Sequence, residues 1–260
     1  MDDAILRTED IMIKFGGLTA VSGFTVELKK SSITSLIGPN GAGKTTAFNI
    51  ITGFYKPTSG KVLFDGQDIT GKPPHLVCKA GIARTFQNIR LFSGGTVLQN
   101  VMTACWVRQK SPWWAAPLGL PSFRREENEI RERSLNLLGE VGLDVVAHEV
   151  ATSLPYGAQR RLEICRALAT EPKLLLLDEP AAGMNPQESG ELMDFIRTIR
   201  KKFNITIMLI EHDMKVVMGV SEWIRVLDYG QLIAEGTPED IRSNTHVIEA
   251  YLGKEAARNA

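Results

Sequence analysis

Apolar and polar residues alternate along the first third of the chain in the manner of β-strands. A more apolar run then ends in a glycine-rich turn, after which the apolar spacing changes to that of a helix. The elements predicted here are strands at 4–15, 23–30, 33–41 and 61–66, a helix from Lys44 to about Thr52, and a helix leading into a strand within 75–87.

The final third alternates regularly between apolar strands and amphipathic helices. The strands are predicted at 173–180, 205–212 and 223–228, with helices at 187–203 and 214–220 between them. Strand–helix–strand alternation with nearly continuous apolar strands is typical of a parallel sheet that is covered on both faces. The pattern therefore predicts an α/β protein.

The middle of the chain is predominantly helical. One interruption, WVRQKSPWWAAPLGLPSF, contains three prolines and the tryptophans Trp106, Trp113 and Trp114, so we expect a loop over 106–122. Adjacent tryptophans are typical of a contact surface, or of packing against the helices themselves. We predict a single domain 1–260, divided into an α/β core (1–95 and 171–236), a helical subdomain (96–170) and C-terminal helices (237–260).

Composition narrows the classes of partner. Lys plus Arg and Asp plus Glu both number 30, so the chain has no net positive charge that would favour nucleic acid as a partner. The three cysteines form no CxxC pair, which indicates packing residues in a reducing compartment. No apolar run approaches the ~18 residues of a membrane span, and the acidic start has no signal-peptide core. We expect a cytoplasmic protein that serves any membrane process through a partner.

The turn GPNGAGKTT fits the phosphate-binding pattern G-x-x-x-x-G-K-[ST] between a strand and a helix. Its backbone N–H groups are expected to point at phosphate oxygens, with Lys44 at the β- and γ-phosphates and the Thr45 hydroxyl on Mg²⁺. The alternative is a glycine-rich turn without a ligand. The predicted ATP-binding residues are Gly38, Pro39, Asn40, Gly41, Ala42, Gly43, Lys44, Thr45 and Thr46.

Polar residues at the ends of other apolar strands extend this site. Asp178 and Glu179 follow LLLL and are placed at the carboxyl edge of a parallel sheet, where Asp178 can hold Mg²⁺ and Glu179 can activate water. Gln87 is predicted to contact both Mg²⁺ and the water, and His212 to lie near the γ-phosphate. Each of these residues also has a simpler interpretation, as a cap or loop residue.

A second helix start has anion-binding features. LPYGAQRRLEICRALA, at 154–169, runs from a turn into a helix without Ser, Thr, Asp or Asn at its entrance. The free N–H groups and the dipole of such a helix favour an anion.

The order of these motifs resembles the nucleotide-binding subunit of ABC transporters. In more detail, KFGGLTAV, ARTFQNIRLF, DEPAAGMNP and IEHDMKVVMG resemble the ATP-binding subunit of Liv-type branched-chain amino-acid importers. The resemblance implies a RecA-like P-loop NTPase core with N-terminal antiparallel strands and an inserted helical subdomain. It also implies that Phe15 stacks on adenine, with a core aromatic as the alternative. Gln87 would sense the γ-phosphate, and His212 would stabilise the transferring phosphoryl group.

The resemblance also assigns the helix start at 154. In this family two ATPase subunits pack head to tail, and the signature helix of one faces ATP held by the other. The usual Leu-Ser-Gly-Gly-Gln is replaced here by Leu154, Pro155, Tyr156, Gly157 and Ala158, and Asn185 stands at the D-loop position where Asp is common. These departures suggest that the site served by this chain's signature is the weaker of the two.

The partners implied by the resemblance are a second ATPase subunit, two membrane permease subunits and, indirectly, an external solute-binding protein. A heterodimer is expected, with a homodimer as the alternative, on the cytoplasmic face of the inner membrane. The transported solute is expected to be a branched-chain or other hydrophobic amino acid. The alternatives are a urea or amide importer, an envelope-lipid exporter, a soluble GTPase or kinase, and an ATPase without a transporter.

Overall fold

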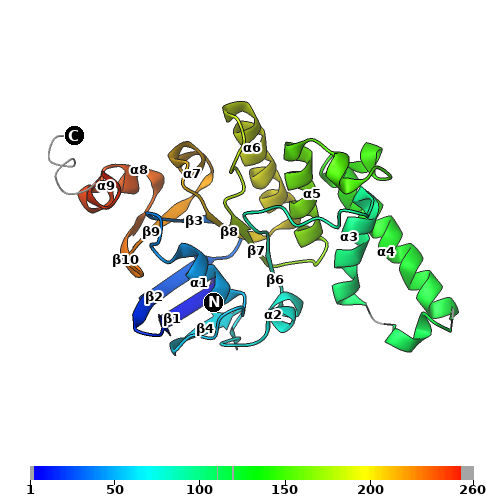
Figure 1. Cartoon of the computed structure of the whole chain (residues 1–260), viewed down its shortest axis with the longest axis horizontal. Coiled ribbons are helices and arrows are strands. Elements are labelled where there is room, and N and C mark those ends of the chain that lie inside the picture. The colour runs from blue at the N-terminus through cyan, green and yellow to red at the C-terminus, as the bar shows by residue number, and fades with distance from the viewer. Residues whose placement is uncertain (1–2, 110, 119, 253–260) are drawn as a thin grey trace. The chain divides into compact units, whose positions relative to one another are not determined.

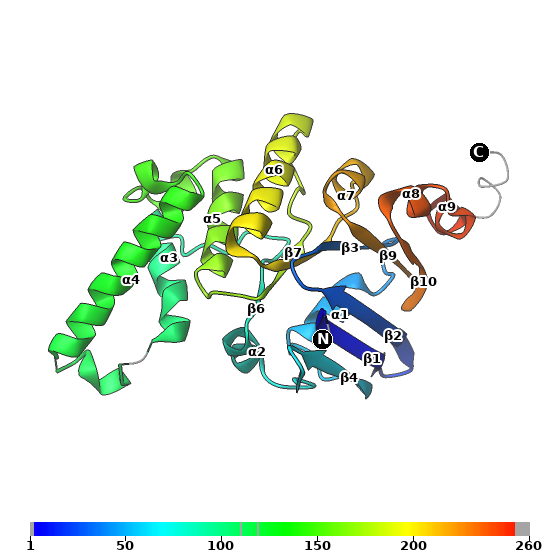
Figure 2. The same cartoon turned by 180° about the vertical axis from the view of Figure 1, so that it is seen from behind.

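A computed structural model describes residues 3–109, 111–118 and 120–252 (Figures 1 and 2). The chain divides into two compact units, one formed by Met1–Gln87 with Lys173–Ala260 and the other by Asn88–Pro172. The predicted helical subdomain, 96–170, lies inside the second unit. Residues 88–95 belong there as well because the side chain of Asn100 binds this segment, its Oδ1 accepting from the N–H of Phe92 at 2.9 Å.

A six-stranded sheet forms the centre of the first unit, in the order β10-β9-β3-β8-β7-β6. The strands from β9 to β6 are parallel, as the alternating pattern predicts, and every residue of β3, β7 and β8 is buried. The strand bounds are Ile33–Ile37 (β3), Ile82–Arg84 (β6), Leu174–Asp178 (β7), Thr206–Ile210 (β8), Trp223–Asp228 (β9) and Gln231–Gly236 (β10).

The N-terminal strands form a separate antiparallel sheet in the order β2-β1-β4-β5. Its strands are Ala4–Phe15 (β1), Leu18–Lys29 (β2), Ser59–Phe64 (β4) and Gln67–Asp68 (β5). β2 begins five residues before the predicted start at 23, because Gly16 and Gly17 form a tight turn that pairs Phe15 with Leu18. The α/β fold with N-terminal antiparallel strands is confirmed.

One hydrophobic core lies between these two sheets. Phe48 and Ile51 of α1 (Lys44–Ile51) pack there with Leu6 of β1 and with Leu176 and Met208 of the six-stranded sheet. Figure 2 shows α1 between the two sheets, and α6 and α7 over the opposite face of the larger one. The other helices of this unit are α2 (Pro74–Ala80), α6 (Pro186–Phe203), α7 (Met214–Val220), α8 (Pro238–Arg242) and α9 (Thr245–Leu252).

The sequence pattern does not predict β10. Its residues are mostly half-buried and lack a strong apolar alternation, because it is an edge strand that pairs with β9 alone. It follows β9 through a two-residue turn in which Tyr229 and Gly230 both have positive φ, at 42° and 78°. Such turns are favoured by Asn-Gly, so Tyr-Gly is a weak signal in the sequence.

The second unit is helical. It contains α3 (Val97–Cys105), α4 (Pro121–Glu140) and α5 (Tyr156–Leu168). On α4 the apolar residues Ile130 and Leu138 are buried, and Ser134 is buried between them, where its hydroxyl donates to the Ile130 carbonyl at 2.7 Å. Across the described ranges, no helix is long and apolar enough to cross a membrane.

The tryptophan-rich segment contains short 3₁₀ turns at Trp106–Arg108 and Trp113–Ala115 rather than only irregular loop. Trp106 stacks on Phe123 of α4, with 5.4 Å between ring centroids, so this end of the segment packs against the helical unit. Trp114 is 47% exposed. Lys110, Gly119 and the side chain of Trp113 lie outside the described part.

Candidate functional site

The phosphate loop, residues 38–46, connects β3 to α1 as its motif requires. Gly38 and Gly43 have φ of +149° and +100°, and a Cβ on them would lie 1.9 Å from the Leu227 carbonyl oxygen and 2.7 Å from the Ala20 carbonyl oxygen. Neither position can accept another residue without moving the backbone. The two glycines therefore fix the curl of the loop.

A cavity of about 350 Å³ opens over this loop. Thr45 is exposed and Thr46 half-buried, so hydroxyl groups are present at the start of α1. α1 has no side-chain cap at Gly43 and no acidic residue in its first turn, which leaves its N-terminus favourable to an anion. The cavity is lined by Leu18, Thr19, Ala20, Asn40, Gly41, Ala42, Gly43, Lys44, Thr45, Thr46, Glu179 and Tyr229.

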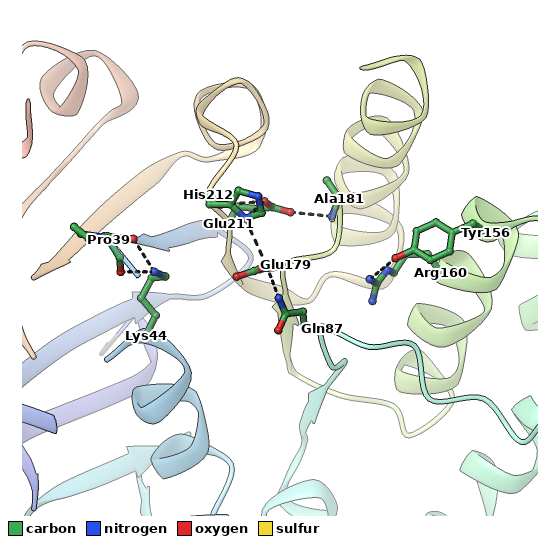
Figure 3. A network of polar contacts seen from close by, with 10 residues as sticks. Pro39, Lys44, Gln87, Tyr156, Arg160, Glu179, Ala181, Glu211 and His212 are labelled. Atoms are coloured by element: carbon green, nitrogen blue, oxygen red, sulfur yellow. Dashed lines mark hydrogen bonds and ion pairs between the residues drawn. The ribbon is translucent and has the colours of Figure 1, made fainter. Parts of the chain in front are cut away.

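The side chain of Lys44 is held by two carbonyl groups of the phosphate loop. Its Nζ donates to the carbonyl oxygens of Gly38 at 2.6 Å and Pro39 at 2.9 Å (Figure 3). Burial lowers the pKa of Lys44 below its ordinary value, and the carboxylates of Glu179 and Asp178 act in the opposite direction. The backbone N–H of Ala42 donates to the Pro39 carbonyl oxygen at 3.2 Å. This N–H group is therefore turned into the loop, whereas the sequence predicts that the N–H groups of the loop point at phosphate oxygens.

Asp178 ends β7 and is buried beside Arg84 of β6. Arg84 donates to Asp178 Oδ2 at 2.7 Å and to Asn49 Oδ1 at 2.6 Å. The guanidinium also lies 5.5 Å from the ring centre of Phe48 and 5.2 Å from that of Phe86. Arg84 thereby joins Asp178 to the helix that follows the phosphate loop. The sequence pattern does not single out Arg84, and its position in a short apolar strand is the available signal.

We expect Arg84→Ala to lower the free energy of unfolding by about 3–5 kcal/mol, because it leaves the buried Asp178 carboxylate without its ion-pair partner. Denaturant unfolding measures this loss. The matched control is Arg7→Ala, whose ion pair with Glu27 is exposed and should contribute less than about 1 kcal/mol. Equal losses in the two variants would show that the Arg84 pair has no special role.

Glu179 follows Asp178 in a left-handed conformation, with φ of 46°. Its backbone N–H donates to the Ile210 oxygen at 2.9 Å, which holds it at the edge shared by β7 and β8. Its Oε2 accepts from Gln87 Nε2 at 2.8 Å and lies 3.6 Å from His212 Nδ1 (Figure 3). The structure thus brings together three predicted residues that are distant in the chain. Gln87 stands three residues beyond the end of β6, rather than at the strand end as predicted.

Glu211, which the sequence analysis did not select, lies beneath this group and is 1% exposed. Its carboxylate accepts from the backbone N–H of Ala181 at 2.8 Å and of His212 at 3.1 Å. Burial raises the pKa of Glu211 above its ordinary value, and the N–H donors act against that shift.

Phe15 and Asn185 lie outside the lining of the cavity. Phe15, at the end of β1, is 46% exposed and makes an edge contact with Tyr55 at 5.2 Å between ring centroids. Asn185 caps α6, its Oδ1 accepting from the N–H groups of Gln187 and Glu188, both at 3.0 Å. The adenine and D-loop roles of these two residues stay predictions.

Helix α5, for which the signature role is predicted, begins at Tyr156 after Pro155 within its own unit, with no side-chain cap. A Cβ on Gly157 would meet nothing within 4 Å, so no contact inside the chain requires glycine there. The hydroxyl of Tyr156 accepts from Arg160 Nη2 at 3.3 Å, and Arg160 is fully buried and paired with Glu163 at 2.9 Å. The predicted bare helix start is confirmed.

The metal-binding capacity of the described residues can be judged from their clusters of potential ligands. No group of three or more His, Cys, Asp or Glu suited to a metal ion occurs among the residues that the structure describes. Mg²⁺ bound with a nucleotide needs only one or two protein oxygens, since phosphates and waters fill its remaining positions. The Mg²⁺ roles of the Thr45 hydroxyl and the Asp178 carboxylate stay predictions.

Comparison with known proteins places these features in a family. Residues 21–182 match the family model described as ABC transporter, and residues 231–257 match that of the branched-chain amino acid ATP-binding cassette transporter. The chain is 48% identical to the high-affinity branched-chain amino acid transport ATP-binding protein LivG of Escherichia coli (strain K12), over 98% of this chain and 100% of that protein.

Two further similarities agree with this family assignment. BraF of Pseudomonas aeruginosa, a protein with the same description, is 46% identical over 98% of this chain and 100% of its own length. The crystal structure of a nucleotide-free ATP-binding cassette from an ABC transporter superposes with a TM-score of 0.84 at 34% identity, covering 96% of this chain and 100% of that one.

Proposed function

Because the chain belongs to the ATP-binding, ATP-hydrolysing subunits of ABC transporters, we propose that it powers the uptake of branched-chain or other hydrophobic amino acids. The observation that carries the proposal is the cavity over the phosphate loop, which combines Lys44 with Glu179. The amino-acid substrate is supported by the near full-length similarity to LivG and BraF and by the match at residues 231–257.

ATP binding is proposed to use the phosphate loop and its helix. Backbone N–H groups of the loop and the start of α1 would bind the phosphates, with the Lys44 ammonium at the β- and γ-phosphates. In this arrangement Lys44 exchanges its contacts with the Gly38 and Pro39 carbonyls for phosphate oxygens. Phe15 is proposed to stack on adenine from the exposed end of β1.

Mg²⁺ would be held by the Thr45 hydroxyl, by Asp178 and by Gln87, together with the phosphates. The ion supplies positive charge that offsets the negative charge developing on the phosphate oxygens. Arg84 occupies Oδ2 of Asp178 and leaves the second carboxylate oxygen for this contact, directly or through water.

Hydrolysis is proposed to depend on Glu179, which accepts a proton from the attacking water. Gln87 donates to its Oε2 and would orient it, while the half-exposed His212 is proposed to stabilise the transferring phosphoryl group. Both neighbours reach the same carboxylate oxygen, so the second oxygen of Glu179 is available to water.

The signature helix is proposed to bind ATP held by a second ATPase subunit. Its uncapped start, from Pro155 to Ala158, offers N–H donors and a helix dipole, and Gly157 leaves room for close approach from outside the chain. The second subunit is proposed to be non-identical. Two permease subunits would complete the transporter, and an external binding protein would deliver the solute without touching this chain.

Uptake measurements test the proposal. In a strain lacking this chain we expect uptake of labelled leucine, isoleucine and valine to fall to background and to be restored by the wild-type gene but not by Lys44→Ala. Labelled urea and an unrelated amino acid serve as controls. Loss of urea uptake alone would show that urea is the transported solute. Unchanged uptake of all solutes together with a defect in envelope lipids would show that the chain serves a lipid exporter.

A further inference from the structure

The contacts of Glu211 join two loops that carry the polar groups of the site. β7 and β8 are paired so that Asp178 stands opposite Ile210, and Glu179 and Glu211 are therefore the first residues beyond the ends of two adjacent strands. Glu179 turns into the cavity, whereas Glu211 turns into the protein and is 1% exposed.

The buried carboxylate reaches across this strand pair. One oxygen accepts from Ala181 N at 2.8 Å, in the turn after Glu179, and the other accepts from His212 N at 3.1 Å. The N–H of Asp213 also donates to this carboxylate. A carboxylate has two acceptor oxygens, so it can satisfy both loops at once. A neutral glutamine has one acceptor oxygen and would direct its NH₂ group at a backbone donor.

We infer that Glu211 is a positioning residue that fixes the spacing between Glu179 and His212. Glu211 lies too deep to reach a nucleotide and acts through the two loops that it joins (Figure 3). His212 Nδ1 lies 3.6 Å from Glu179 Oε2 and 3.9 Å from Glu211 Oε2, so a shift of either loop changes the first distance. This inference rests on the proposed roles of Glu179 and His212.

The burial of Glu211 supports this positioning role. A buried carboxylate destabilises a fold unless hydrogen bonds compensate it, and here all the compensating donors belong to the two loops. An apolar residue at 211 would avoid the desolvation cost but would leave the Ala181 and His212 donors without this acceptor.

The test is Glu211→Gln in the transporter assembled with its permease subunits. We expect kcat for ATP hydrolysis to fall about 10- to 100-fold, since small misplacements of reacting groups have effects of that size. The affinity for ATP should stay within about 2-fold, because Lys44 and the phosphate loop are untouched. Glu222→Gln is the matched control, since Glu222 is exposed and pairs with Arg200 away from these loops.

A double-mutant cycle separates positioning from general destabilisation. In a His212→Ala background, where the spacing to be fixed no longer exists, Glu211→Gln should reduce kcat by less than about 3-fold. An equal loss in both backgrounds, or wild-type kcat in Glu211→Gln, would overturn the inference. Wild-type kcat in Glu179→Gln and in His212→Ala would instead refute the proposed roles of those residues.

A readout independent of activity completes the test. Amide hydrogen exchange should accelerate in Glu211→Gln over 180–184 and 211–215 and stay unchanged in β7 and β8. If Glu211→Gln does not fold, Glu211→Asp takes its place. This variant keeps the charge on a shorter side chain, so it should retain ATP binding and show the same two local changes. Uniform acceleration across the sheet would overturn the inference.

Discussion

Glu179→Gln is expected to slow ATP hydrolysis by about 10²- to 10⁴-fold, the usual contribution of a general base, while ATP binding is retained. Glutamine preserves the size of the side chain and can still accept the bond from Gln87, but its amide cannot take a proton from water. Phosphate release under single-turnover conditions measures the chemical step, and equilibrium binding measures the affinity for ATP.

Glu191→Gln provides a matched control. Glu191 also accepts a hydrogen bond from a glutamine amide, that of Gln187 at 3.2 Å, but it lies exposed on α6. Its substitution should leave hydrolysis unchanged. A loss of less than about 10-fold in Glu179→Gln would place the general base elsewhere.

The same substitution tests the proposed inequality of the two ATP sites. In the proposed pair of subunits, Glu179 would work with the signature of the partner, whereas the signature predicted for this chain has Pro155 in place of the usual Ser and lacks its hydroxyl. A hydrogen bond to a charged phosphate contributes about 1.5–3 kcal/mol, so the site served by Pro155 should be the weaker one. Glu179→Gln should therefore reduce transport far more than the corresponding change in the partner subunit, and equal losses would contradict the asymmetry.

Lys44→Ala is expected to weaken ATP binding about 10- to 100-fold, which corresponds to the loss of a charge-assisted hydrogen bond to phosphate. Hydrolysis and transport should fall at least as far, because the same ammonium is proposed to offset charge on the β- and γ-phosphates. Titration with a fluorescent ATP analogue measures the affinity, and thermal unfolding without nucleotide checks that the fold is intact.

Lys61→Ala is the control for Lys44→Ala, since Lys61 is exposed on β4 and does not line the cavity. Its affinity for ATP should equal that of the wild type. Unchanged affinity in Lys44→Ala would mean that the cavity over the phosphate loop does not hold the triphosphate.

Local patterns in the sequence predict most of the elements and the conformation of the loops at the strand ends. The glycines of the phosphate loop, the acids after LLLL and the bare start of α5 each depend on a few consecutive residues. Their conformations follow from short-range sterics and hydrogen bonding, so the sequence is sufficient. The apolar strands likewise specify a parallel sheet without reference to the rest of the fold.

Arg84, Glu211 and β10 show where local patterns fail. Arg84 and Asp178 are 94 positions apart, and Glu211 and Ala181 are 30 apart. A charged residue in the sequence predicts exposure, and its burial becomes favourable only when a distant segment supplies a partner. β10 is an edge strand whose only hydrogen-bonded neighbour is β9, so its formation depends on a partner strand and not on its own sequence pattern.

The amino-acid pattern alone is enough to specify an α/β protein with a phosphate loop and to identify the residues that follow its apolar strands. The convergence of Gln87 and His212 on one oxygen of Glu179, and the contacts of Arg84 with Asp178 and of Glu211 with Ala181, become visible only in the folded chain. Turns and strands are stabilised by neighbours in the chain, whereas buried charges are stabilised by neighbours in space.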